Sequence, residues 1–126
     1  MRNSHSLRSH FLLLTLTFAA LIAIGCGKDQ STMTDAELGL NAQQSAGRKI
    51  YNIYCLNCHP AYSTHGNKGP GLKGLYGKPY LPSGLTATDE HVIQSIVQGR
   101  GKMPRFSDSM SRQEIQAVVA YLHTLY

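Results

Sequence analysis

The chain has 126 residues, with twelve Lys and Arg against seven Asp and Glu, a formal charge of +5. This length suffices for one domain, and the absence of a basic run or a basic helix face excludes a nucleic-acid-binding surface. Arg2 and Arg8 precede Cys26, so the remainder is only mildly basic. With Cys55 and Cys58 the cysteines number three, and an odd number cannot close a disulfide framework.

Residues 1–25 have the pattern of an export signal. A basic, acid-free stretch precedes an apolar run from Phe11 to Ile24, which is shorter than the roughly 20 residues that span a bilayer. It ends at Ala23-Ile24-Gly25-Cys26, which resembles the lipobox of bacterial lipoproteins, with alanine where a larger aliphatic residue is usual. We expect cleavage before Cys26 and its acylation on the periplasmic side of a bacterial membrane, the outer membrane included. An ordinary cleaved signal, which would leave a periplasmic protein, and an uncleaved anchor are the alternatives.

The rest of the chain divides into a linker and a domain. Residues 26–41 are polar, with few large apolar side chains, which indicates a tether. Residues 42–126 carry the helical patterns and form the predicted domain. Its first helix is predicted from Ala42 to Tyr54 with Asn41 as a possible N-cap, because apolar residues recur at helical spacing.

That helix leads directly into Cys55-Leu56-Asn57-Cys58-His59. Two thiols three positions apart, followed by an imidazole, are the attachment signal of c-type haem, in which each sulfur forms a thioether and the histidine binds iron as an axial ligand. A Cys-x-x-Cys pair can also be a redox dithiol or half of a zinc site. No second cysteine pair exists to complete a zinc site. The motif predicts one haem c per chain.

A glycine-rich segment follows at residues 68–84, where five glycines and three prolines exclude a regular helix or a central strand. Its leucines and tyrosines indicate packing against an apolar surface. A metal-bound histidine usually donates its other ring nitrogen to a fixed acceptor. Pro70 offers only a carbonyl, held in a rigid frame, so we expect His59 to donate to Pro70.

A second helix is predicted from Asp89 to Gln98, capped by Thr88 or Thr86 and ended by Gly99. Met103 follows, in a segment where Pro104 favours extended backbone. A thioether there suits the sixth position of the iron and gives His/Met ligation, which raises the reduction potential. The other candidate ligands are Met110, His65, His91 and His123.

The last helix begins at Ser111-Arg112-Gln113-Glu114, which fits a capping box, and apolar residues follow at helical spacing as far as Leu122. No alternating strand pattern occurs. The prediction is a small all-α domain with about three main helices.

These features together resemble the class I mono-haem cytochromes c over residues 42–126. The shared elements are a glycine and an aromatic residue in the first helix, the haem motif, a Gly-Pro-x-Leu-x-Gly loop, a Met-Pro segment and an aromatic residue in the last helix: Gly47, Tyr51, Cys55–His59, Gly69–Gly74, Met103-Pro104 and Tyr121. The resemblance implies a small cytochrome c fold wrapped around one covalently bound haem. It also implies polar contacts to the haem propionates, for which Tyr76, Tyr80 and Arg105 are candidates. The tryptophan that often serves there is absent.

The expected function is a one-electron carrier rather than an enzyme, either free or as the electron-transfer subunit of a larger oxidoreductase. Its partners would be a donor and an acceptor redox protein, reached at a membrane through lipidated Cys26; no nucleic acid and no small-molecule substrate is expected. Loop lysines could steer an acidic partner surface or be merely solvated: Lys68, Lys73, Lys78 and Lys102. One alternative is a gas sensor or small peroxidase with a displaceable sixth ligand, and another is a thiol oxidoreductase using Cys55 and Cys58.

Overall fold

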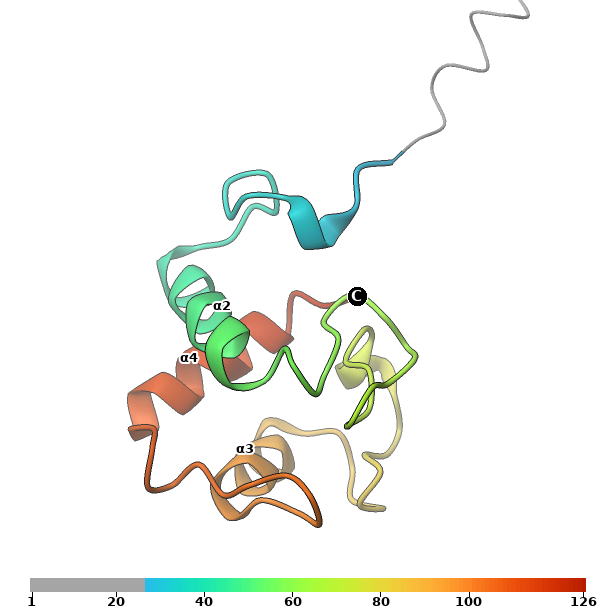
Figure 1. Cartoon of the computed structure of the whole chain (residues 1–126), viewed down its shortest axis with the longest axis vertical. Helices are drawn as coiled ribbons and strands as arrows, with labels where there is room; N and C mark the ends of the chain where they lie inside the picture. Colours follow the sequence, from blue (N-terminus) through green and yellow to red (C-terminus); the bar gives the residue numbers. More distant parts are fainter. Residues whose placement is uncertain (1–26) are drawn as a thin grey trace, which may run out of the picture.

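The computed structural model describes residues 27–126, so the predicted signal and Cys26 lie outside the described residues. Three α-helices and two short 3-10 helices follow one another (Figure 1): η2 (Gln30–Thr32), α2 (Ala42–Tyr54), η3 (Leu75–Gly77), α3 (Asp89–Gln98) and α4 (Arg112–Leu122). Within this part of the chain, β structure is limited to isolated bridges, and none of its helices has the length and apolarity needed to cross a bilayer. The predicted all-α class with three main helices is confirmed.

Local capping sets the helix boundaries. The Asn41 side chain accepts from the Gln44 N–H at 2.9 Å, and Gln44 Oε1 accepts from the Asn41 N–H at 2.9 Å. Ser111 and Glu114 make the same reciprocal pair at the start of α4, and Thr88 caps α3. Each cap satisfies donors that a helix start leaves unpaired, which is why the predicted starts agree with the observed ones.

Helices α2 and α4 cross closely, with α3 packed against α4 (Figure 1). At the crossing, Gly47 lies against the main chain of Ala117. The rings of Tyr51 and Tyr121 meet edge to face beside it, with centroids 5.2 Å apart and an interplanar angle of 62°. Both tyrosines are almost fully buried. This crossing places the end of α2, and therefore the motif that follows it, against the core.

The glycine-rich segment contributes apolar side chains to the core. Leu75 and Leu81 are buried, and Leu72 and Tyr76 are partly buried against the same cluster. Tyr80, by contrast, is 61% exposed. The apolar packing predicted for this segment is therefore carried by its leucines and by Tyr76.

The segment predicted as a polar tether has defined structure from Lys28 onward. The Arg48 side chain, only 12% exposed, donates from Nη1 to Asp35 Oδ1 at 2.8 Å and from Nη2 to the Met33 carbonyl at 2.8 Å. Leu40 packs against the core. A guanidinium can satisfy two acceptors at once through its planar fork, so Arg48 of α2 and the apolar contact of Leu40 together hold this polar segment against the domain.

Candidate functional site

The motif continues α2 by one further turn. The N–H of Cys55 donates to the Tyr51 carbonyl at 2.8 Å, and the N–H groups of Cys58 and His59 donate to the Cys55 carbonyl at 3.0 and 2.8 Å. Both cysteines are half-buried free thiols. Burial, with a contribution from Cys58, raises the pKa of the Cys55 thiol to about 11, so this thiol stays protonated at neutral pH.

His59 is oriented by the loop that faces the motif. Its Nδ1 lies 2.9 Å from the Pro70 carbonyl oxygen. Because a carbonyl only accepts, Nδ1 must carry the ring proton, which leaves the Nε2 lone pair for a metal. The donor set is thus two thiols able to form thioethers and an imidazole in its metal-binding tautomer, and this set fits a c-type haem.

Gly69 makes a contact with His59 that sequence reasoning missed. A methyl group at Gly69 would lie 2.3 Å from Cε1, 2.7 Å from Nε2 and 2.8 Å from Nδ1 of the His59 ring. The backbone of Gly69 therefore touches the ring directly, and no larger residue fits without displacing it. A signal was present in the sequence, since Gly69 directly precedes the predicted acceptor Pro70.

Main-chain hydrogen bonds fasten the glycine-rich loop to the motif. The Gly69 N–H donates to the Cys58 carbonyl at 2.9 Å, and the Leu72 N–H donates to the Pro60 carbonyl at 2.9 Å. The Asn67 side chain adds a bond to the Asn57 carbonyl at 3.1 Å. Two main-chain bonds and one side-chain bond therefore hold the loop that carries Pro70 beside His59.

Met103 lies on a turn of its own after α3. Its N–H and carbonyl bond reciprocally with those of Arg100, at 2.9 and 3.0 Å, and its side chain packs against the core cluster. Three residues later, the ring of Phe106 meets Tyr54 edge to face, with centroids 5.9 Å apart. Because Tyr54 directly precedes Cys55, the Met103 segment is tied to the end of the helix that enters the motif.

The three predicted propionate contacts differ in their surroundings. Tyr76 stacks on His123, with ring centroids 3.8 Å apart and an interplanar angle of 7°, and its buried hydroxyl has no hydrogen-bond partner. Burial, with the neighbouring Asp89, raises the pKa of Tyr76. Tyr80 is 61% exposed, and Arg105 is also exposed.

Several of the alternative ligands have other partners. The ring of His91 bonds to the Thr86 carbonyl at 2.9 Å through Nδ1, and His123 Nε2 lies 2.7 Å from Asp89 Oδ1. His65 is exposed, on the same stretch of chain as His59. Across residues 27–126 no group of three or more His, Cys, Asp or Glu side chains could hold a metal ion, so a zinc site at the motif lacks its ligands in this part of the chain.

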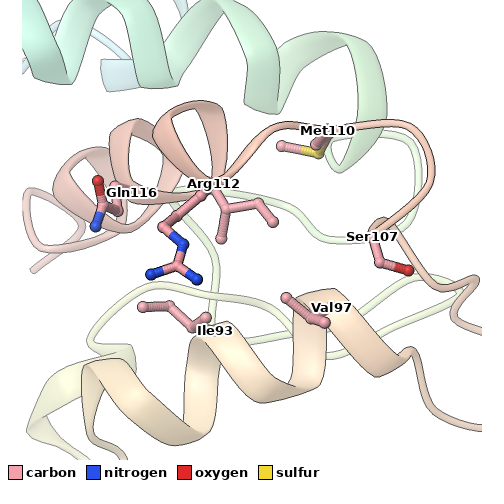
Figure 2. A pocket seen from close by; sticks show the side chains of 7 residues that line it. Ile93, Val97, Ser107, Met110, Arg112 and Gln116 are labelled. Carbon is pink, nitrogen blue, oxygen red and sulfur yellow. The ribbon is translucent and has the colours of Figure 1, made fainter.

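A separate pocket of about 460 Å³ lies between α3 and α4 (Figure 2). Its walls are mostly apolar, with the guanidinium of Arg112 reaching between the two helices; the lining residues are Ile93, Val97, Ser107, Met110, Arg112, Ile115 and Gln116. Met110, the second candidate ligand, belongs to this pocket. Neither the motif nor Met103 lines it.

Comparison with known proteins finds a matching family and several similar proteins. Residues 42–122 match the family described as cytochrome C oxidase, cbb3-type, subunit III. The chain is 31% identical over 81 residues to cytochrome c6 of Leptolyngbya boryana, which covers 64% of this chain and 91% of that protein. It is 32% identical over 95 residues to the cbb3-type cytochrome c oxidase subunit FixP of Azorhizobium caulinodans, covering 75% of this chain but 31% of FixP. A solved structure of cytochrome c6 from the diatom Phaeodactylum tricornutum has 30% sequence identity and a TM-score of 0.49, covering 63% of this chain and 88% of that one.

Proposed function

The chain belongs to the cytochrome c oxidase, cbb3-type, subunit III family, and from this membership we propose that it carries single electrons between redox proteins through one covalent haem c. It is a cytochrome c6-like electron carrier and not an enzyme. Cys55 and Cys58 attach the haem and His59 binds its iron. The observation that carries the proposal is the bond from His59 Nδ1 to Pro70, at 2.9 Å, because it commits that nitrogen as a donor and frees Nε2 for iron.

We propose Met103 as the sixth ligand. The contact between Phe106 and Tyr54 supports this assignment, since it ties the Met103 segment to the helix that ends at Cys55. Reciprocal bonds with Arg100 hold the main chain of Met103 in a tight turn, so a ligand there would be held by backbone geometry. Met110 is buried in a different place, in the wall of the pocket between α3 and α4.

Bound haem supplies the one-electron iron couple, and the protein supplies position and surroundings. Pro70 and Gly69 hold the His59 ring from two sides. Four lysines on the loops make no ion pair within residues 27–126 and are available to steer an acidic partner surface: Lys68, Lys73, Lys78 and Lys102. We also propose Tyr76, Tyr80 and Arg105 as contacts to the haem propionates.

A second candidate is the electron-transfer subunit of a larger oxidoreductase. The observation that favours it is the similarity to FixP, which is a subunit of a cbb3-type cytochrome c oxidase. This chain spans about a third of FixP. The thiol oxidoreductase is disfavoured, because a Cys55 thiol whose pKa is raised to about 11 by burial has little of the thiolate that such chemistry requires.

Absorption spectra of the purified holoprotein test both the haem and its sixth ligand. Met103→Leu is expected to abolish the band of methionine sulfur on ferric haem and to lower the reduction potential, because His/Met ligation raises it. Met110→Leu is the matched control and is expected to keep both. Leucine and methionine are close in volume, so Met110→Leu is expected to cost less than about 1.5 kcal/mol of stability. Met103→Leu keeps the side-chain volume but also loses the proposed bond to iron.

Other outcomes of that experiment discriminate between the hypotheses. A band that is lost in Met110→Leu instead would transfer the ligand to Met110. Carbon monoxide binding by the reduced wild-type protein would favour the sensor or peroxidase with a displaceable ligand. A colourless protein with titratable Cys55 and Cys58 thiols would refute the haem assignment altogether.

For location, we propose export and acylation of Cys26, which would place the domain on the periplasmic side of a bacterial membrane. The lipobox-like sequence before Cys26 supports this. The wild-type protein is expected in the membrane fraction and Cys26→Ala in a soluble or uncleaved form without incorporated fatty acid. Labelled palmitate and cell fractionation measure both. A wild-type protein that is soluble and unlabelled would instead indicate an ordinary cleaved signal.

A further inference from the structure

The hydroxyl of Tyr51 bonds to the main-chain carbonyl of His59, eight residues further along the chain. Tyr51 lies in the last turns of α2 and its side chain is 0% exposed. Burial raises the pKa of its hydroxyl, so the group is a neutral donor at any ordinary pH. A carbonyl oxygen only accepts, which sets the direction of the bond from Tyr51 to His59.

The His59 carbonyl has no main-chain donor within the described part of the chain. The neighbouring carbonyls do: Cys58 accepts from the Gly69 N–H and Pro60 from the Leu72 N–H, each at 2.9 Å. Of the three consecutive carbonyls, that of His59 alone depends on a side chain. The Tyr51 hydroxyl therefore holds the carbonyl of His59, while the Pro70 carbonyl holds the His59 ring through Nδ1 at 2.9 Å.

Tyr51 is itself firmly placed. Its ring packs edge to face against Tyr121, beside the position where Gly47 meets the main chain of Ala117. The Tyr121 hydroxyl donates elsewhere, to the hydroxyl of Tyr62 at 3.1 Å. The two rings thus share one packing site, but only the Tyr51 hydroxyl reaches the residue that would bind iron.

We propose that Tyr51 is a positioning residue for His59. By holding the His59 carbonyl, its hydroxyl fixes the backbone from which the imidazole projects, so that Nδ1 reaches Pro70 and Nε2 keeps its direction toward the iron. The packing of α2 on α4 is in this way coupled to the orientation of the axial ligand. The inference rests on the proposed haem function, because it concerns the same histidine.

The test compares Tyr51→Phe with Tyr121→Phe in the holoprotein. Each change removes one buried hydroxyl and keeps the ring, so both variants retain the aromatic pair and are expected to fold. The readout is hydrogen exchange of the His59 Nδ1 proton, followed by NMR and referenced to slowly exchanging amides of α4. Tyr51→Phe is expected to accelerate Nδ1 exchange about tenfold more than α4 exchange, the equivalent of one lost hydrogen bond.

The control variant Tyr121→Phe and the NMR resonances of the His59 ring distinguish a positioning role from a merely structural one. Tyr121→Phe is expected to change Nδ1 and α4 exchange by the same factor, with the hyperfine-shifted resonances of the His59 ring unmoved. If Tyr51→Phe also changes both equally and leaves those resonances in place, its hydroxyl is merely structural and the proposal is overturned. A wild-type protein without covalent haem would instead refute the proposed function, and the two failures are therefore distinguishable.

Discussion

Gly47→Ala is expected to lower the free energy of unfolding by about 3 kcal/mol or more. Within an isolated helix the same change would stabilise, by about 1 kcal/mol, because alanine is the better helix former. At the crossing of α2 and α4, by contrast, the same change is expected to destabilise the protein. A methyl group at Gly47 would lie 1.8 Å from the Ala117 carbonyl oxygen and 2.4 Å from its carbonyl carbon. These are main-chain atoms of α4, so α2 and α4 must separate.

Separation would also break the edge-to-face contact between Tyr51 and Tyr121 and loosen the end of α2 that carries Cys55. Urea unfolding followed by far-UV circular dichroism measures the change. Gly77→Ala is the control, since nothing lies within 4 Å of a methyl group there, and a shift under about 1 kcal/mol is expected. An unchanged or raised midpoint for Gly47→Ala would contradict the close crossing.

Gly69→Ala is expected to displace His59, the proposed axial ligand. The added carbon would lie 2.3 Å from His59 Cε1, so either the ring turns away or the loop retreats. Both movements break the bond from Nδ1 to Pro70. Losing such a supporting contact typically weakens metal binding about 10–100-fold.

The measurement for Gly69→Ala is the ligation state of the ferric holoprotein by absorption and electron paramagnetic resonance, across an acid titration. We expect conversion from the low-spin form at a higher pH than in the wild type, because iron holds a misplaced imidazole less tightly and protons displace it from that nitrogen more easily. Gly77→Ala again serves as the control. Low-spin spectra and an acid midpoint identical to wild type would show that the ring has room that the structure does not indicate.

Local sequence rules account for the starts of the helices and, in the site, for the pairing of His59 with Pro70. Asn41 and the Ser111–Glu114 box define helix starts from residues three positions apart, and such contacts are readable without any tertiary information. The pairing of His59 with Pro70 was also predictable, since a metal-bound imidazole needs an acceptor and a proline can offer only its carbonyl.

Contacts between distant residues were not predictable in the same way. The stacking of Tyr76 on His123 joins residues 47 positions apart, and no local sequence pattern predicts it. Arg48 binds Asp35 and the Met33 carbonyl, which holds a polar segment that composition alone indicated as a tether. Each of these depends on the path of the chain between the partners.

By itself, the sequence determined the all-α class and the helix boundaries and presented the haem-attachment motif Cys55–His59, because these depend on neighbours within about one helical turn. Only the tertiary structure decided which groups hold His59 in place. Gly69 touches its ring and Tyr51 bonds its carbonyl, and both contacts exist because α2 and the glycine-rich loop meet at His59, with α4 packed against Tyr51. Glycine and tyrosine have many structural roles in proteins, so only the packing of this fold shows that Gly69 and Tyr51 hold His59.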